Sequence, residues 1–193
     1  MMANDFSITY APVTPERWED LEKLFGPSGA CSGCWCTWWR LSRKEFSAFS
    51  YDEKKTVLRT VVQSGQEPGL LAYVDGTPAG WVSVGPREVY PALERSRVFK
   101  RVDDAPTWCI NCFFIDKHFR HMGLMSGLIE AALDFARGRG AALIEAYPVE
   151  PHEGSDSGSL YYGVVSTFQA AGFVEVARRS EHHPVMRLTL SQP

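Results

Sequence analysis

The sequence of 193 residues has no apolar run approaching the roughly 18 residues that a membrane-spanning helix needs. Its first residues also lack the basic start and apolar stretch of a secretory signal. We therefore expect a cytoplasmic protein that does not bind a membrane.

An excess of positive charge is also missing. Twenty Lys and Arg stand against 23 Asp and Glu, which gives a formal net charge of −3 and an isoelectric point near 6.0. Proteins that bind nucleic acids normally cluster Lys and Arg to meet the phosphates. The composition therefore favours a small soluble ligand and argues against a nucleic-acid partner.

The five cysteines do not form the even set that a secreted disulfide framework requires. We expect reduced thiols at Cys31, Cys34, Cys36, Cys109 and Cys112. Cys109 and Cys112 lie three positions apart on a predicted strand, where side chains alternate, so we expect them on opposite faces and not on one metal ion. A zinc site made of the first three thiols and a histidine remains an alternative.

What the sequence does contain is a series of helical and extended patterns without a linker or an internal repeat. The expected strands cover residues 7–10, 69–74, 79–84, 108–115, 142–147, 173–179 and 185–190, and the expected helices cover 15–25, 51–62, 124–139 and 160–171. This order predicts one mixed α/β (α+β) domain over residues 1–193. Residues 86–107 form a long charged connection, which we interpret as a candidate cover over a site.

The segment 108–140 holds the strongest candidate site. An apolar strand runs through a short turn into a helix that begins at Leu124. Backbone N–H groups at the start of a helix have no partner inside it, and the helix dipole favours an anion there. Gly123 lets the backbone approach a phosphate closely, and Arg120 adds positive charge. The turn is therefore suited to a pyrophosphate.

Three stretches resemble the GNAT acyltransferases in order and spacing. Residues 74–81 (Val-Asp-Gly-Thr-Pro-Ala-Gly-Trp) look like the family's hairpin, residues 115–123 resemble its cofactor motif, and residues 170–173 (Ala-Ala-Gly-Phe) resemble the end of its last helix. The resemblance implies a GNAT fold, with a splayed, mixed and mostly antiparallel sheet of about six to seven strands and about four helices.

It also implies acetyl-CoA or another short acyl-CoA as cosubstrate, and no metal. By position, backbone groups of Phe113, Phe114 and Ile115 hold the pantetheine arm. The residues expected to hold the diphosphate through their amides are Arg120, His121, Met122, Gly123, Leu124, Met125 and Ser126. The family usually has Gly or Ala where Met125 stands, so the resemblance requires this side chain to point away from the phosphates.

The family's usual general acid is absent. Many members carry a tyrosine four residues before the final Gly-Phe pair, where this chain has Phe168. We predict substitutes in Glu145 and Tyr147, which share one face of the strand beside the acyl-bearing strand. Tyr161 and Tyr162 precede Phe168 by one to two helical turns, and of these two Tyr162 is preferred as a catalytic residue. Packing and structural hydrogen bonds are the alternative roles for all four.

The resemblance places the segment after the first helix at the mouth of the acceptor pocket. Trp35, Cys36 and Trp38 are the acceptor-binding candidates, because tryptophan rings form an apolar wall or a cation–π surface for an ammonium group. Core packing is the alternative for these rings and for Trp39. On the strand 108–115, where some members place a base, Asn111 at most orients a water molecule.

We therefore expect an acyl-CoA-dependent N-acyltransferase that moves an acetyl or short acyl group to a primary amine of a small molecule. Two alternatives remain: a non-catalytic acyl-CoA sensor, which the missing tyrosine would suit, and a cysteine-based metal or redox module. Dimers are common among proteins of this kind, which leaves a homodimer open. Fold alone does not choose the acceptor.

Overall fold

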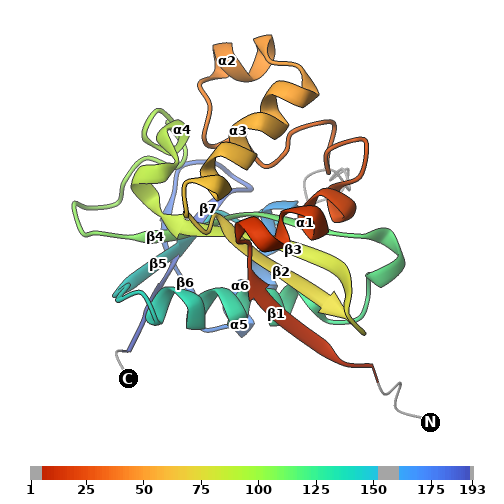
Figure 1. Ribbon diagram of the computed structural model, residues 1–193. Coiled ribbons are helices and arrows are strands. Elements are labelled where there is room, and N and C mark those ends of the chain that lie inside the picture. Colours follow the sequence, from red (N-terminus) through yellow and green to blue (C-terminus); the bar gives the residue numbers. More distant parts are fainter. Residues whose placement is uncertain (1–5, 152–160, 192–193) are drawn as a thin grey trace.

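The computed structural model describes residues 6–151 and 161–191, and a seven-stranded sheet forms the centre of this part (Figure 1). The strands are β1 (Ile8–Pro12), β2 (Gly69–Val74), β3 (Thr77–Pro86), β4 (Trp108–Ile115), β5 (Leu143–Ala146), β6 (Val174–Arg178) and β7 (Pro184–Thr189). They are ordered β1-β2-β3-β4-β5-β7-β6, and every neighbouring pair is antiparallel except β4 and β5. This confirms the expected fold class and strand number.

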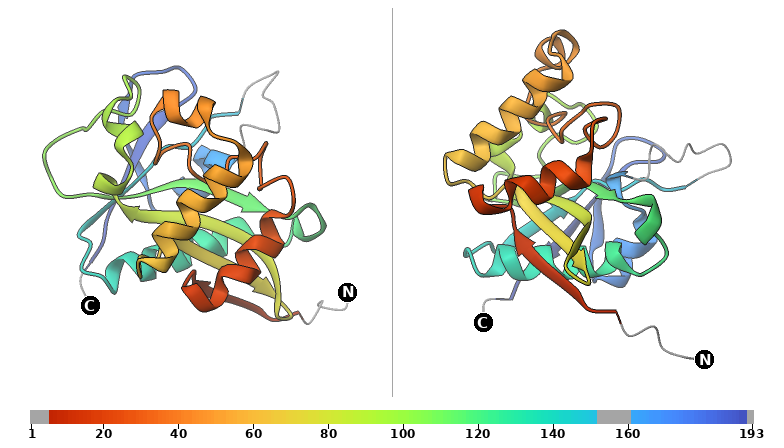
Figure 2. Two further views of the ribbon diagram at one scale, coloured as in Figure 1. Left: turned by 45° about the horizontal axis from the view of Figure 1, so that its top comes forward. Right: turned by 45° about the vertical axis from the view of Figure 1, so that its right-hand side comes forward.

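Six α-helices, counted over the same two ranges, cover both faces of the sheet. They are α1 (Trp18–Phe25), α2 (Arg43–Ala48), α3 (Tyr51–Gln63), α4 (Pro91–Glu94), α5 (Leu124–Arg137) and α6 (Val165–Ala170), with single 3-10 turns η1 (Pro15–Arg17), η2 (Arg87–Val89) and η3 (Lys117–Phe119). Figure 2 shows α1 and α3 on one face and α5 on the other. Where the chain is described, no helix has the length and apolar character needed to span a bilayer.

Two of these helices escaped the sequence prediction. α2 buries none of its residues, so it has no apolar stripe, although Ser42 and Glu45 form a capping box at its start. α4 is a single turn opened by Pro91. The helix expected over 160–171 is α6, which begins later; residues 152–160 lie outside the described part of the chain.

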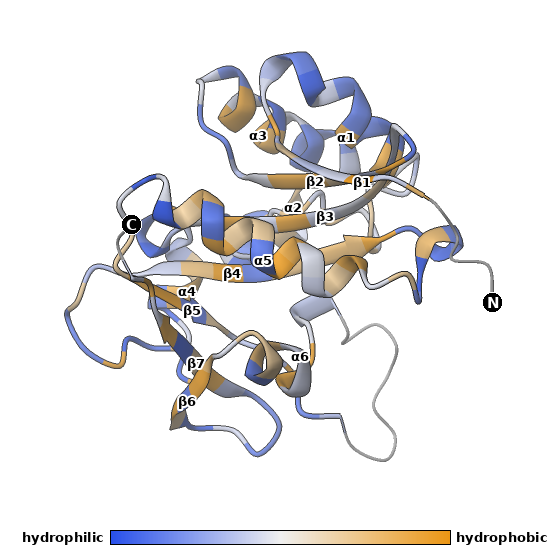
Figure 3. Cartoon of the chain, turned by 90° about the horizontal axis from the view of Figure 1, so that it is seen from below, coloured by the Kyte–Doolittle hydropathy of each residue, from blue (hydrophilic) through white to orange (hydrophobic). Residues whose placement is uncertain are grey.

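The core divides by sheet face because side chains alternate along each strand. On β3, Val82 faces the α5 and α6 side and belongs to the larger apolar cluster, while Trp81 faces α1 and α3. α5 places Leu128 and Ala132 in the larger cluster, as its periodicity predicted. Figure 3 shows the apolar strands between helices whose outer faces are hydrophilic.

β4 carries a β-bulge at Asn111, where the sheet also splays. Ser83 of β3 pairs with Cys112 and Val84 pairs with Ile110, so Asn111 is an extra residue on β4. The parallel pairing of β4 with β5 stops at Ile110, and beyond it the two strands diverge (Figure 3). The residues of β4 that follow Ile110 therefore have no pairing partner in β5.

The bulge corrects one expectation about the thiols. Cys109 pairs with Gly85 and Cys112 with Ser83, and these two β3 residues share a face because they are two positions apart. The extra residue shifts the alternation by one, so Cys109 and Cys112 lie on the same face and not on opposite faces. Over residues 6–151 and 161–191, however, no three His, Cys, Asp or Glu side chains are arranged to hold a metal ion.

The long connection between β3 and β4 is anchored and does not cover either of the cavities described below. The Arg87 guanidinium donates hydrogen bonds to the carbonyl oxygens of Leu93 and Phe99, at 3.3 Å and 2.6 Å between nitrogen and oxygen. Phe99 packs between Trp39 and Tyr147. The connection therefore supports the tryptophan segment from behind, and its interpretation as a cover is not supported by the lining of the cavities.

Candidate active site

The turn between β4 and α5 leaves the helix start open. His121 and Gly123 adopt positive φ values of 64° and 77°, and α5 begins after Gly123 without a side-chain cap. Glycine suits this left-handed conformation, and no atom lies within 4 Å of the place where a Cβ would project. The first amides of α5 are thus available to an anion.

A cavity of about 540 Å³, which we call the turn cavity, opens at this turn. Nine of the ten residues predicted to bind the cofactor line it: Phe113, Phe114, Ile115, Arg120, His121, Gly123, Leu124, Met125 and Ser126. The tenth, Met122, packs against the larger apolar cluster instead. The structure therefore brings together the predicted pyrophosphate turn and the end of β4, as a cofactor site requires.

A second cavity, of about 610 Å³, is also lined by residues of β4; we call it the aromatic cavity. Eight of its fifteen lining residues are aromatic: Phe25, Trp38, Trp39, Phe46, Trp81, Phe113, Phe114 and Tyr161. Cys31, Phe113, Phe114 and Tyr161 line both cavities. The two cavities therefore meet at the end of β4, beside Tyr161.

Two of the three predicted acceptor residues line the aromatic cavity, namely Cys36 and Trp38. Trp35 instead packs in the core near α1, with its ring stacked 6.2 Å from that of Trp18. Phe25, Phe46 and Trp81 were not predicted, because they come from α1, α2 and β3 and only the folded sheet brings them together. No local signal in the sequence connects these three rings.

Four cysteines line the aromatic cavity: Cys31, Cys34, Cys36 and Cys112. Hydrogen bonds donated by the Cys112 thiol and by the indole of Trp81, whose Nε1 lies 3.3 Å from Sγ of Cys36, lower the pKa of Cys36. Burial raises the pKa of Cys34 to about 11. Hydrogen bonding thus lowers the pKa of Cys36, whereas burial raises the pKa of its neighbours Cys31 and Cys34.

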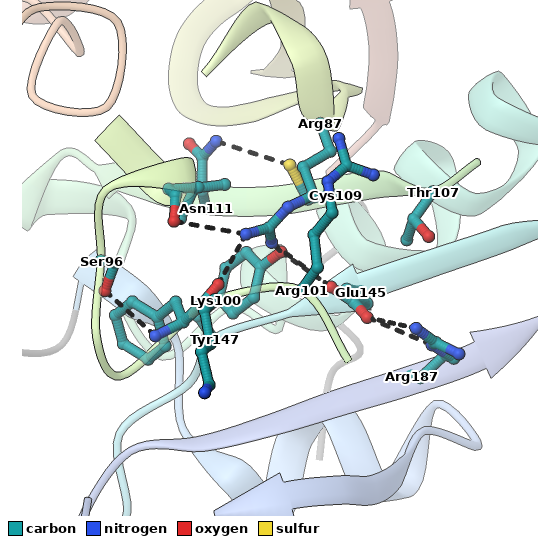
Figure 4. A network of polar contacts seen from close by, with 12 residues as sticks. Arg87, Ser96, Lys100, Arg101, Thr107, Cys109, Asn111, Glu145, Tyr147 and Arg187 are labelled. Carbon is teal, nitrogen blue, oxygen red and sulfur yellow. Dashed lines mark hydrogen bonds and ion pairs between the residues drawn. The ribbon is translucent and has the colours of Figure 1, made fainter. Parts of the chain in front are cut away.

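Glu145 and Tyr147, two of the predicted acid–base residues, lie side by side in a buried polar network (Figure 4). The Tyr147 hydroxyl donates to Glu145 Oε2 at 2.9 Å, and Arg187 donates to Glu145 Oε1 at 2.7 Å. Arg87 donates to the Tyr147 hydroxyl. Burial raises the pKa of Tyr147 well above its usual value. Neither residue lines either cavity, so their catalytic role stays a prediction, with a structural role as its alternative.

The tyrosine at the junction of the cavities is Tyr161, the less favoured of the two neighbouring tyrosines. Tyr162 packs instead against Trp39, with ring centroids 6.1 Å apart, and against the Tyr161 ring at 4.7 Å. Its hydroxyl hydrogen bonds to that of Tyr161, while burial raises the pKa of both. Phe168 is fully buried against Phe113, which makes it a core residue. Of these two tyrosines, Tyr161 lines the junction of the cavities and Tyr162 contacts Tyr161.

Residues 35–162 match the acetyltransferase (GNAT) family. The fold is similar to that of an N-acetyltransferase from Staphylococcus aureus Mu50 (TM-score 0.57, 14% identity, 96% of this chain and 99% of that one). It is also similar to PaiA N-acetyltransferase from Thermoplasma acidophilum in complex with coenzyme A (TM-score 0.53, 15% identity, 95% and 99%). A third similar structure is YncA of Salmonella typhimurium, a putative acetyltransferase with its cofactor acetyl-CoA (TM-score 0.56, 14% identity, 96% and 95%). Among curated proteins, none has a matching sequence.

Proposed function

Since the chain belongs to the acetyltransferase (GNAT) family, we propose that it transfers an acetyl or short acyl group from coenzyme A to a primary amine of a small molecule. Acetyl-CoA is the cosubstrate of the family. The observation that carries the proposal is the meeting of two cavities at the end of β4, one beside an open helix start and one lined by aromatic rings. A thioester held at that junction would lie next to an acceptor bound in the aromatic cavity.

The turn cavity has the chemistry that a diphosphate needs. The first amides of α5 border it, and Arg120 adds a positive charge. The divergence of β5 leaves the edge of β4 after Ile110 available to the amide groups of a pantetheine arm. We assign Phe113, Phe114 and Ile115 to that arm.

The reaction requires a neutral amine, attack on the thioester carbonyl and loss of the thiolate. The C–N bond forms as the C–S bond breaks. The sulfur takes up one proton, and the nitrogen, which becomes positively charged as it attacks, releases one proton to the same relay. Tyr161 lies at the junction where the sulfur leaves, and Tyr162 is placed to return a proton through their hydrogen bond. Holding both reactants in adjoining cavities supplies much of the rate gain. Tyr147 and Glu145 form the alternative proton route.

The proposal is tested by calorimetry with coenzyme A and acetyl-CoA, followed by mass spectrometry of products from a panel of amines. Replacing Arg120 by Gln is expected to weaken coenzyme A binding by about tenfold, because a charge-assisted contact to a phosphate is lost. Lys117→Gln is the matched control, since Lys117 is an exposed cation of the same turn that does not line the cavity. A well-folded protein that binds neither thioester nor coenzyme A contradicts the proposal.

A non-catalytic acyl-CoA sensor is the second candidate, and the observation that favours it is Phe168 at the position where many members of the family carry the catalytic tyrosine. The same experiment separates the two. A sensor binds acetyl-CoA and acylates no amine of the panel, whereas an enzyme does both.

A further inference from the structure

Asn111 carries a buried oxygen that has no hydrogen-bond partner within the described chain. Its side chain is 2% exposed and lines the aromatic cavity. Among residues 6–151 and 161–191, none donates a hydrogen bond to Oδ1, whereas Nδ2 lies 4.0 Å from Sγ of Cys109. Buried polar atoms are nearly always paired, so an exception next to a cavity indicates an acceptor held ready for a ligand.

The bulge explains why this side chain is presented there. An extra residue in a strand is left out of the ladder, and its side chain is re-aimed. Asn111 is that residue in β4. Its backbone carbonyl is fixed as well, because it accepts a hydrogen bond from the indole Nε1 of Trp39 at 3.2 Å. The backbone that carries the orphan oxygen is therefore tied to Trp39, which lines the same cavity.

The rings that line the same cavity form a frame for a flat apolar group. Trp38, which is 39% exposed, meets the Phe46 ring at 88° with centroids 4.9 Å apart. Trp39 meets Trp38 at 78° and 6.4 Å. Aromatic rings prefer such edge-to-face and offset contacts, and a ligand ring entering the cavity can extend the same pattern. A mostly apolar wall with a few polar groups is typical of a small-molecule site.

We propose that the acceptor is a primary amine attached to an aromatic body, an arylalkylamine, and that its N–H donates a hydrogen bond to Oδ1 of Asn111. This rests on the proposed function, because it names the acceptor of that same site. The described residues that line this cavity include no Asp or Glu, so burial there favours the neutral amine over the ammonium ion, and the neutral amine is the form that attacks a thioester. The hydrogen bond also orients the amine, because fixing one N–H direction leaves the nitrogen lone pair free to point toward the thioester carbonyl.

The first test compares acceptors in the presence of acetyl-CoA. Tryptamine and 2-phenylethylamine are compared with hexylamine, which is apolar but has no ring, with spermidine, which is a polycation, and with a lysine-containing peptide. We expect kcat/KM for the aryl amines to exceed that for each of the others by about a hundredfold, in line with what a shaped pocket with one polar contact discriminates. Products are quantified by mass spectrometry, because the cavity thiols would react with thiol dyes.

The second test uses variants of the two wall residues. Asn111→Leu removes the oxygen but keeps the shape, and we expect KM for tryptamine to rise by about tenfold or more while coenzyme A affinity is unchanged. Its melting temperature should hold or rise, because the orphan atom is gone; a merely structural asparagine would lose stability instead. Asn111→Asp replaces the neutral acceptor by a carboxylate, which stabilises the ammonium ion, and is therefore expected to lower aryl amine turnover. Trp38→Ala raises KM, and Trp38→Phe, which keeps a ring, restores most of the loss.

The outcomes are distinguishable from failure of the proposed function, which calorimetry with coenzyme A decides alone. If coenzyme A binds and spermidine, hexylamine or the peptide is acylated as well as tryptamine, the acceptor class is wrong. If tryptamine does not bind to the protein saturated with coenzyme A, the proposal is also wrong. An unchanged KM in Asn111→Leu overturns the role of Asn111.

Discussion

Two buried polar regions lie along β4, and they differ in whether their polar atoms are paired. The network around Glu145 and Tyr147 has a partner for each charged group, through Arg87 and Arg187. The aromatic cavity contains Asn111, whose Oδ1 has none where the chain is described. Paired buried groups use their hydrogen bonds to stabilise the fold, whereas an unpaired acceptor can still accept a hydrogen bond from a ligand.

The paired network has a clear structural task. Arg87 reaches Glu145 at 3.5 Å and Glu94 at 2.9 Å, and it also binds the carbonyl oxygens of the connection between β3 and β4. Arg187 joins Glu145 to Asp103 of the same connection. The network thus fixes residues 86–107 against β5 and β7, and Phe99 of that connection supports Trp39 of the cavity.

The largest effect is expected from breaking this network. Arg87→Met removes one partner of a buried ion pair and leaves carbonyl oxygens without donors, so we expect a loss of about 3–5 kcal/mol in the free energy of unfolding. Urea unfolding followed by circular dichroism measures it. Arg137→Met, which breaks an exposed i,i+3 pair with Asp134, is the control and should cost less than about 1 kcal/mol. Unchanged stability with lost turnover would instead move Glu145 and Tyr147 into the active site.

The second effect concerns the tyrosine at the junction of the cavities. Tyr161→Phe is expected to lower kcat by about a hundredfold, the scale of a lost general acid, with little change in coenzyme A affinity. Tyr162→Phe should lower kcat less, since it acts through Tyr161. Single-turnover kinetics with a saturating amine provide the measurement. If Tyr147→Phe lowers kcat more than Tyr161→Phe does, the proton route runs through the paired network and the contrast between the two regions fails.

The third effect tests the phosphate turn. Gly123→Ala forces an alanine into φ near 77°, which costs about 1–2 kcal/mol for a residue with a Cβ, and the distorted turn should bind coenzyme A more weakly. Thermal unfolding and calorimetry measure the two changes. Gly138→Ala is the matched control, because Gly138 has an ordinary helical φ of −60°. Equal behaviour of the two variants would mean that the turn does not shape the diphosphate site.

The β2–β3 hairpin, α5 and the turn before α5 could be predicted from local sequence, whereas the aromatic cavity could not. Asp75-Gly76 supplies two positive φ values for the β2–β3 hairpin, and the stripe of α5 is visible in its spacing. The bulge at Asn111 depends on pairing with β3, so no pattern within β4 reveals it. Without the bulge, alternation places Cys109 and Cys112 on opposite faces, which is the error that the structure corrects.

The candidate catalytic residues show the same division between what local sequence reveals and what the fold decides. Alternation correctly placed Glu145 and Tyr147 together, but it gave no information on their arginine partners, which come from η2 and β7. Choosing Tyr162 over Tyr161 required the direction of each ring relative to the end of β4, and that direction is set by the fold. The sequence therefore revealed the titratable residues, but it did not reveal whether other side chains of the fold already pair with them.

The smallest effect concerns the thiols of the aromatic cavity. Cys36 accepts hydrogen bonds from Cys112 and from Trp81, and the first of these is the largest cause of its lowered pKa. Cys112→Ala removes that donor, so the pKa of Cys36 should rise; a rise of about one unit, or about 1.4 kcal/mol, would cut its thiolate fraction near neutral pH by about fivefold. Iodoacetamide alkylation of Cys36, mapped by mass spectrometry across pH, should therefore shift to higher pH. Cys112→Ser keeps a donor at the same place and should shift less. An identical pH profile in the wild-type protein and Cys112→Ala would show that the Cys112 thiol does not lower the pKa of Cys36.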